Sequence, residues 1–247
     1  MKFAFCNYAF GDRFIAAQIR QNELIKAQQF DEIHSLGPAD LGEEFTNRHK
    51  DIDENPAAPI RNGVPFIIPM PIWKPYIMFK LLNDLEFGDI LLYMDVLDDV
   101  TGNPRLKEYL IDRTNENDGF ATMNLPWPNS QWTRRDSFVL MNCDTQEYWD
   151  CPQTEAGFIG LRKSMKTMEF LAAWLTYIMD PRIAASLMVN QFGDNHPNFR
   201  DHRADQSIYS LLLKRFGVQR TDAGAGMARY GLSHWMEGAA SWGTNYG

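Results

Sequence analysis

The sequence has few of the features that mark secreted, membrane-spanning or zinc-stabilised proteins. Its three cysteines, Cys6, Cys143 and Cys151, are odd in number and lack CxxC spacing, which argues against a disulfide framework or a structural zinc site. No stretch reaches eighteen apolar residues, and Gly11-Asp12 ends the short apolar run at the N-terminus too early for a signal peptide. We therefore expect no transmembrane segment and a reducing, cytoplasmic location.

Basic residues are scarce relative to acidic ones. The chain has 24 lysines and arginines against 32 aspartates and glutamates, a formal net charge of −8. Proteins that bind nucleic acid need a basic surface, so we expect no nucleic-acid partner. An anionic nucleotide held through a metal ion remains compatible with this charge. The GxGxxG, P-loop, GxSxG and HExxH patterns are also absent, which removes the main support for the enzyme classes that use them.

The composition is that of a folded protein of moderate size. Of the 247 residues, 45% are apolar and 13% are aromatic, which favours a well-formed core over disorder. The length suits one large α/β domain. A proline-rich connector at residues 51–71 joins two stretches of similar composition, so we interpret it as a loop. We expect a single domain over residues 1–247.

The chain is organised around one stretch, residues 73–99. Its first part has apolar residues at helical spacing, and Ile90–Met94 then has the length and composition of a strand that is covered on both faces. Three acids, Asp95, Asp98 and Asp99, follow directly. Open α/β sheets bind ligands at the carboxyl ends of their strands. The pattern therefore predicts an acidic rim at an active site.

Three carboxylates within five residues raise one another's pKa unless a cation or hydrogen-bond donors lie near. Hard oxygen ligands favour Mg²⁺ or Mn²⁺, and Mg²⁺ commonly uses one or two carboxylates together with substrate phosphates. The acids therefore predict a metal-bound diphosphate as the ligand. The alternative interpretation is a solvated turn with a cap.

The N-terminal region reads as a strand over residues 2–9, a helix over 13–29 and a second strand over 30–34. This order predicts a parallel βαβ unit and an α/β fold. Asn7 and Tyr8 come at the end of the first strand, where they could stack on or hydrogen-bond a nucleotide base. Packing in the core is the alternative for the aromatic residue.

Lys74 lies beside Trp73 at the start of the helix that precedes the acidic rim. A lysine at a helix N-terminus opposes the helix dipole, a small penalty unless an anion is also bound there. Lys74 is therefore a candidate phosphate contact. A solvated lysine beside a packed tryptophan is equally compatible with the local sequence.

Farther along the chain, we expect helices over residues 41–50 and 164–179 and strands over residues 137–143 and 155–161. An apolar helix begins at Asp205 and Gln206, where an aspartate is commonly a cap. The crowding of acidic, basic and amide side chains just before this helix, with His202 and Arg203 among them, also predicts a functional site.

Five segments together resemble a known family. The sequence is similar to the nucleotide-sugar-dependent glycosyltransferases of the GT-A type, most closely to a group of bacterial and large-virus members, and more distantly to glycogenin-like and lipopolysaccharide galactosyltransferase-like enzymes. The resemblance covers most of the chain, to about residue 217. It is carried by the combination and order of WKPYI at Trp73–Ile77, GDILLYMD at Gly88–Asp95, QTEAGF at Gln153–Phe158, the pair Trp174-Leu175, and HRADQSIYSLLL at His202–Leu213.

The resemblance implies roles for several residues. Lys74 occupies the place of a basic residue that contacts the donor, and Asp95 matches the first acid of a metal-binding DxD motif. Leu97 stands where the second acid would be, and Asp98 follows one residue later. A C-terminal histidine often completes the metal shell in these relatives, and His234 is the possible counterpart.

The same relatives place an Asn-Ala-Gly-like segment beside the donor sugar and an Asp-Gln pair near its anomeric carbon. Glu155, Ala156 and Gly157 resemble the first, and Asp205 and Gln206 resemble the second. Either Glu155 or Asp205 is then the candidate base for the acceptor hydroxyl or the group that stabilises the cationic sugar.

The expected fold is a GT-A-like, Rossmann-type mixed sheet flanked by helices, with the nucleotide bound by residues 1–100 and the acceptor by residues 101–247. The expected function is transfer of a sugar from a nucleoside diphosphate sugar to a glycan or other hydroxyl acceptor, with Mn²⁺ or Mg²⁺. One alternative is a sugar- or nucleotide-binding protein of the same fold without catalysis. Another is a nucleotidyltransferase, for which Gly11-Asp12-Arg13 makes a poor basic loop.

Overall fold

The computed structural model describes residues 1–53, 60–61, 64–65, 71–97, 103–186, 188–218, 221–222 and 230. Its main sheet has five strands in the order β2-β1-β5-β9-β6. The first three run parallel, and β9 is antiparallel to both β5 and β6. The bounds are β1 Phe3–Tyr8, β2 Glu32–Leu36, β5 Ile90–Met94, β6 Phe120–Ala121 and β9 Phe158–Arg162. The protein is thus a mixed α/β structure.

Smaller strands form two further sheets. In one of them β7 lies between β10 and β8, parallel to the first and antiparallel to the second. The other is the antiparallel pair of β3 and β4. The bounds are β3 Ile60–Arg61, β4 Val64–Pro65, β7 Met123–Pro128, β8 Pro152–Thr154 and β10 Thr221–Asp222.

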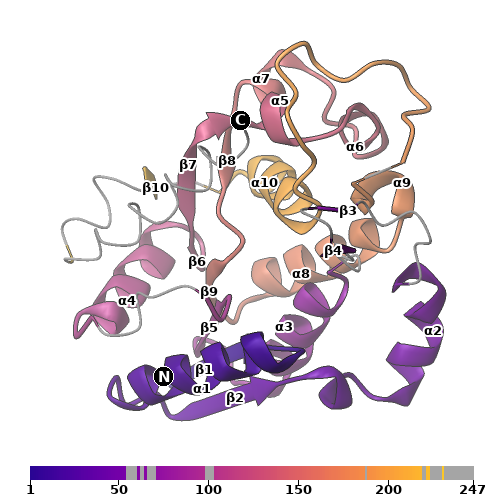
Figure 1. Cartoon of the computed structure of the whole chain (residues 1–247). Coiled ribbons are helices and arrows are strands. Elements are labelled where there is room, and N and C mark those ends of the chain that lie inside the picture. Colours follow the sequence, from indigo (N-terminus) through magenta and orange to yellow (C-terminus); the bar gives the residue numbers. More distant parts are fainter. Residues whose placement is uncertain are drawn as a thin grey trace.

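Helices cover both faces of the main sheet, and α5, α6 and α7 gather at the end of the molecule opposite α1 and β2 (Figure 1). The helices are α1 Asp12–Lys26, α2 Glu43–Asp53, α3 Trp73–Asp84, α4 Leu106–Glu116, α5 Asn129–Trp132, α6 Arg135–Leu140, α7 Gln146–Trp149, α8 Met165–Ile178, α9 Pro181–Ala184 and α10 Asp205–Arg215, with a 3-10 turn η1 at Pro38–Leu41. None of the helices in this described part of the chain has both the length and the apolar character needed to cross a membrane.

The two faces of the sheet follow from the alternation of side chains along β1 and β5. Phe5 and Leu92 point into a cluster with side chains of α1 and α4, whereas Cys6 and Tyr93 point into a larger cluster with α3, α8 and α10. All five residues of β5 are buried, as the continuous apolar run predicts. Each buried Leu, Ile or Phe side chain contributes roughly 1.5–3 kcal/mol of transfer free energy.

Gly160 shows how closely the layers approach. A Cβ atom there would lie 2.7 Å from Leu110 Cδ2 on α4 and 2.8 Å from Ala121 Cβ on β6. Real Cβ atoms do not approach this closely, so β9 needs a glycine at this position. A glycine inside a strand thus permits the close approach of the neighbouring layers here.

The structure confirms the parallel β1-α1-β2 unit, the β5 strand, and helices beginning at residues 165 and 205. The strand expected over residues 137–143 is wrong, because Arg135–Leu140 forms helix α6. A short buried apolar run has the same composition in a strand and in a helix, so only its partners distinguish the two. The strand expected from residue 155 begins instead at Phe158, and the second strand begins at Glu32 rather than residue 30.

Candidate active site

The side chain of Lys74 lies at the centre of the candidate site. It leaves the first turn of α3, and only 6% of it is exposed. Its ammonium nitrogen lies 3.2 Å from Asp95 Oδ1, at the end of β5, and 2.6 Å from Asp205 Oδ2, at the start of α10. The lysine therefore joins the two acids that the sequence places at separate candidate sites.

A third contact completes the surroundings of the ammonium. Lys74 Nζ also donates to the carbonyl oxygen of Ala156 at 3.1 Å. An ammonium has three N–H donors, and these three partners use all of them. A donor phosphate can contact Lys74 only by replacing one partner. Asp95 makes the longest of the three contacts and has a side chain that is 44% exposed, so it is the partner most open to exchange.

The Ala156 carbonyl belongs to a turn between β8 and β9. Within this turn, Glu155 Oε1 accepts a hydrogen bond from the backbone N–H of Gly157 at 2.7 Å. The carbonyl of Gly157 accepts one from the backbone N–H of Asp95, also at 2.7 Å. The turn thus brings the Glu155 segment next to Lys74 and Asp95.

Three carboxyl groups lie within electrostatic range of this ammonium, and two of them, those of Asp95 and Asp205, contact it. Burial raises the pKa of Glu155 to about 7, and the neighbouring Asp95 adds to the increase. Burial also raises the pKa of Asp205, an effect that the ion pair with Lys74 reduces. For Lys74, burial lowers the pKa, but Asp205 and Asp95 together outweigh it and raise the pKa above its ordinary value. At neutral pH the site therefore holds a protonated lysine and a glutamate that titrates.

Asn7 lies beside this site in a buried network of amides. Its Nδ2 donates to Gln21 Oε1 at 2.8 Å and to Asn22 Oδ1 at 2.9 Å, and its Oδ1 accepts from Gln18 Nε2 at 2.9 Å. Gln21 in turn donates to the carbonyl of Asp95 at 2.8 Å. Asn7 therefore connects β1 to α1 and, through Gln21, to the end of β5. Sequence reasoning missed these glutamines, although amides at positions 18, 21 and 22 recur at helical spacing.

Tyr8 and Trp73 stack on each other with ring centroids 4.1 Å apart and planes inclined by 17°. Tyr8 is buried and Trp73 is half-buried. The stack packs the end of β1 against the first turn of α3, the turn from which Lys74 projects. The other aromatic neighbour of Lys74 is Tyr93, whose hydroxyl donates to Asp95 Oδ1 at 2.5 Å.

Gln206 and the residues before it bond to neighbouring segments. Gln206 Nε2 donates to Gln153 Oε1 at 2.6 Å, and Gln153, which is fully buried, donates to Thr133 Oγ1 at 3.2 Å. The guanidinium of Arg203 lies over the ring of Trp132 at 4.5 Å. His202 is buried and bonds to the backbone of Ile183. Lys74, Asp95, Ala156 and Asp205 therefore form the centre, and the other predicted residues surround or support it.

Of the predicted metal ligands, only Asp95 lies within the described residues, and Asp98 and His234 lie outside them. No group of three or more His, Cys, Asp or Glu side chains within the described ranges is arranged to hold a metal ion. Asp95 Oδ1 already accepts contacts from Tyr93 and Lys74. A cation bound to Asp95 would use its second oxygen or displace the lysine.

Three comparisons with known proteins add no further support. No protein-family model, no curated protein and no solved structure matches this chain.

Proposed function

We propose that the protein is a GT-A-like glycosyltransferase that moves a sugar from a nucleoside diphosphate sugar to the hydroxyl of a glycan or another acceptor. One observation carries the proposal. The buried ammonium of Lys74 joins Asp95, at the carboxyl end of a central parallel strand, to Asp205, at the start of α10. Ligands of α/β sheets bind at that end of the strands. A lysine held between carboxylates there suits a reaction in which charge separates.

In the proposed reaction, the acceptor oxygen forms a bond to the anomeric carbon, and the bond between that carbon and the diphosphate oxygen breaks. The diphosphate leaves with the bonding electrons, and Lys74 stabilises its negative charge after giving up its contact with Asp95. A carboxylate near the anomeric carbon stabilises the positive charge that develops there, a role we assign to Asp205. A bound Mn²⁺ or Mg²⁺ would neutralise further charge on the diphosphate.

The proton of the acceptor hydroxyl needs a base. Glu155 suits this role because burial raises its pKa to about 7, close to the pH at which a base works best. Its Oε1 is held by the N–H of Gly157, which fixes the carboxylate beside Lys74 and Asp95. Asp205 is the alternative base if it is the carboxylate that reaches the acceptor.

Asp205→Asn tests the proposal. Asp205 is the first residue of α10, after Ala204 at the cap position, and asparagine there keeps the size and an acceptor oxygen but carries no charge and takes no proton. We expect a folded but less stable protein, because the buried Lys74 loses one of its charged partners, with near-normal binding of nucleotide sugars and a loss of transfer of roughly a hundredfold or more, the scale of acid–base groups. The measurement is product formation from a panel of uridine and guanosine diphosphate sugars, with and without Mn²⁺.

Asp194→Asn is the matched control, because Asp194 is an exposed aspartate in the segment that leads to α10. It should leave transfer unchanged. Full transfer activity in Asp205→Asn would restrict Asp205 to a role in the helix start and would make Glu155 the next residue to test.

A binding protein without catalysis is the second candidate. It is favoured by Leu97, which stands at the place of the second metal-binding acid, and by the three partners that already satisfy Lys74. The two candidates differ in a simple measurement on the unaltered protein. A binding protein is stabilised against heat by a nucleotide sugar but neither hydrolyses nor transfers it.

A further inference from the structure

The backbone just before Asp205 is strained. Ala204 has φ 42° and ψ −106°, a conformation that residues with a Cβ rarely adopt. The residue is buried, so the strain lies inside the protein rather than in a solvated loop. Such conformations persist only where the surroundings hold them, and they are concentrated at functional sites. Contacts from the rest of the protein must therefore hold Ala204 in this conformation.

Contacts from other segments fix the backbone on both sides of Ala204. The N–H of Arg203 bonds to the carbonyl of Trp132 at 3.1 Å and to Ser207 Oγ at 3.2 Å. Ser207 Oγ itself donates to the same carbonyl at 2.6 Å. The short helix α5, which ends at Trp132, thus holds the first turn of α10.

His202 is a further anchor of this segment. It is only 3% exposed, and its Nδ1 accepts the backbone N–H of Arg134 at 3.3 Å. Its other nitrogen, Nε2, therefore carries the proton and donates to the carbonyl of Ile183 at 2.9 Å. Ser186 Oγ also donates to the His202 carbonyl at 3.2 Å. Burial, aided by Arg134, lowers the pKa of His202 to about 3, so the ring stays neutral.

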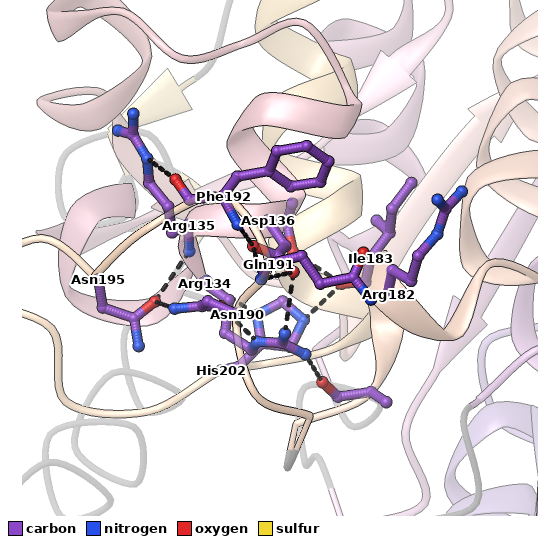
Figure 2. Close-up of polar contacts among 12 residues, drawn as sticks. Arg134, Arg135, Asp136, Arg182, Ile183, Asn190, Gln191, Phe192, Asn195 and His202 are labelled. Atoms are coloured by element: carbon purple, nitrogen blue, oxygen red, sulfur yellow. Dashed lines mark hydrogen bonds and ion pairs between the residues drawn. The ribbon is translucent and has the colours of Figure 1, made fainter.

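The partners of His202 belong to a buried ionic cluster (Figure 2). The guanidinium of Arg134 bonds to the carbonyl of Ala185 and to Asn190 Oδ1, and it lies 3.6 Å from Asp136. Asp136, fully buried, accepts the backbone N–H groups of Gln191 and Phe192. The start of α6 therefore holds both ends of the chain segment that runs from α9 to α10.

We propose that His202 is a positioning residue, which holds Ala204 in its strained conformation and thereby places the Asp205 carboxylate on Lys74. The inference rests on the proposed function only for the consequence that this placement has for sugar transfer. The placement itself is a property of the folded protein. It can therefore be tested without substrate.

The test is two-dimensional NMR of the lysine ammonium groups, with the Lys74 signal assigned by its loss in Lys74→Arg. In the unaltered protein the three partners of Lys74 should make its ammonium hydrogens exchange slowly with water. His202→Leu removes both ring hydrogen bonds. We expect the Lys74 ammonium hydrogens of this variant to exchange roughly five- to tenfold faster, because losing about one hydrogen bond lowers the free energy of local opening by a corresponding amount.

A conservative variant of His202 should restore the slow exchange of the Lys74 ammonium hydrogens. The amide nitrogen of glutamine reaches about as far as histidine Nε2, so His202→Gln can still donate to Ile183, whereas His202→Asn cannot. We expect slow exchange in His202→Gln and fast exchange in His202→Asn. His196→Gln is the matched control, because His196 lies in the same segment and its ring Nδ1 bonds to the nearby Asn198 rather than to the backbone of α9. It should leave Lys74 unchanged.

Ala204→Gly separates positioning from general stability. Glycine adopts positive φ without penalty, so this change should raise the melting temperature of the His202→Leu protein without slowing the exchange of Lys74. The proposal is overturned if Lys74 exchanges slowly in the folded His202→Leu protein. If that variant does not fold, equal exchange in the Gln and Asn variants overturns it instead. Absence of sugar transfer in the unaltered protein would overturn the proposed function and leave this result standing.

Discussion

The two carboxylates that meet at Lys74 are held in different ways. Asp95 ends a central strand, its backbone bonds to Gly157 and Gln21, and its side chain is 44% exposed. Asp205 follows the strained Ala204, and its side chain is 16% exposed. The Asp95 side is thus built from regular structure and nearby amides, whereas the Asp205 side depends on contacts between segments far apart in the chain. A small change in packing should displace Asp205 more readily than Asp95.

Removing Lys74 should abolish the contacts to Asp95 and to Asp205 together and cause the largest loss of stability. Lys74→Met leaves Asp95 and Asp205 without their shared cation, and breaking a buried ion pair costs about 3–5 kcal/mol. Chemical denaturation measures this loss of unfolding free energy. The same substitution at the exposed Lys80, on the same helix, should change it by less than about 0.5 kcal/mol. A loss no larger at Lys74 than at Lys80 would show that the bridge does not support the fold.

The Asp95 side should be sensitive to Asn7→Asp, which affects the amide network. This variant replaces an NH₂ group that faces two acceptor oxygens, those of Gln21 and Asn22, with a further oxygen. We expect a loss of about 1–3 kcal/mol, the cost of leaving buried polar groups unsatisfied. Denaturant unfolding measures the loss, and Asn83→Asp at an exposed position of α3 is the control. Equal stability of the two variants would contradict the assigned role of the network.

Glu155 should make the stability of the protein depend on pH, with a smaller effect than the two substitutions above. Its pKa is raised from 4.5 to about 7 in the folded protein, so the folded state holds a proton that the unfolded state has lost between these values. The contribution of Glu155 to the free energy of unfolding should therefore be largest below pH 4.5. It should fall as the pH rises through about 7, by on the order of 1–2 kcal/mol for a half-buried carboxyl. Unfolding free energies measured from pH 5 to 8 test this.

Glu155→Gln should remove this fall, because glutamine still accepts the N–H of Gly157 but does not titrate. The variant should therefore be more stable than the unaltered protein at pH 8, and the difference should shrink toward pH 5. Parallel curves for the two proteins would place the titration elsewhere in the molecule.

Some local sequence patterns predicted the structure correctly. The continuous apolar run of β5 became a strand buried on both faces, and the acid that follows it became part of the candidate site. The apolar run at residues 137–143 did not follow the expectation and became helix α6, whose Asp136 accepts backbone N–H groups from the segment that leads to α10. The difference arises because β5 has neighbouring strands on both edges, whereas α6 packs against a loop and α9.

The sequence by itself determined the βαβ start, the central strand, and the helices that begin near Lys74 and Asp205, because periodicity and length report which faces are buried. It also identified Lys74, Asp95 and Asp205 as separate candidate site residues. Only the tertiary structure decided that they share one contact, that Asn7 bonds to the amides of α1, and that His202 anchors the strained residue before Asp205. Those pairings join residues far apart in the chain, and a local pattern shows that a polar side chain needs a partner without showing which one.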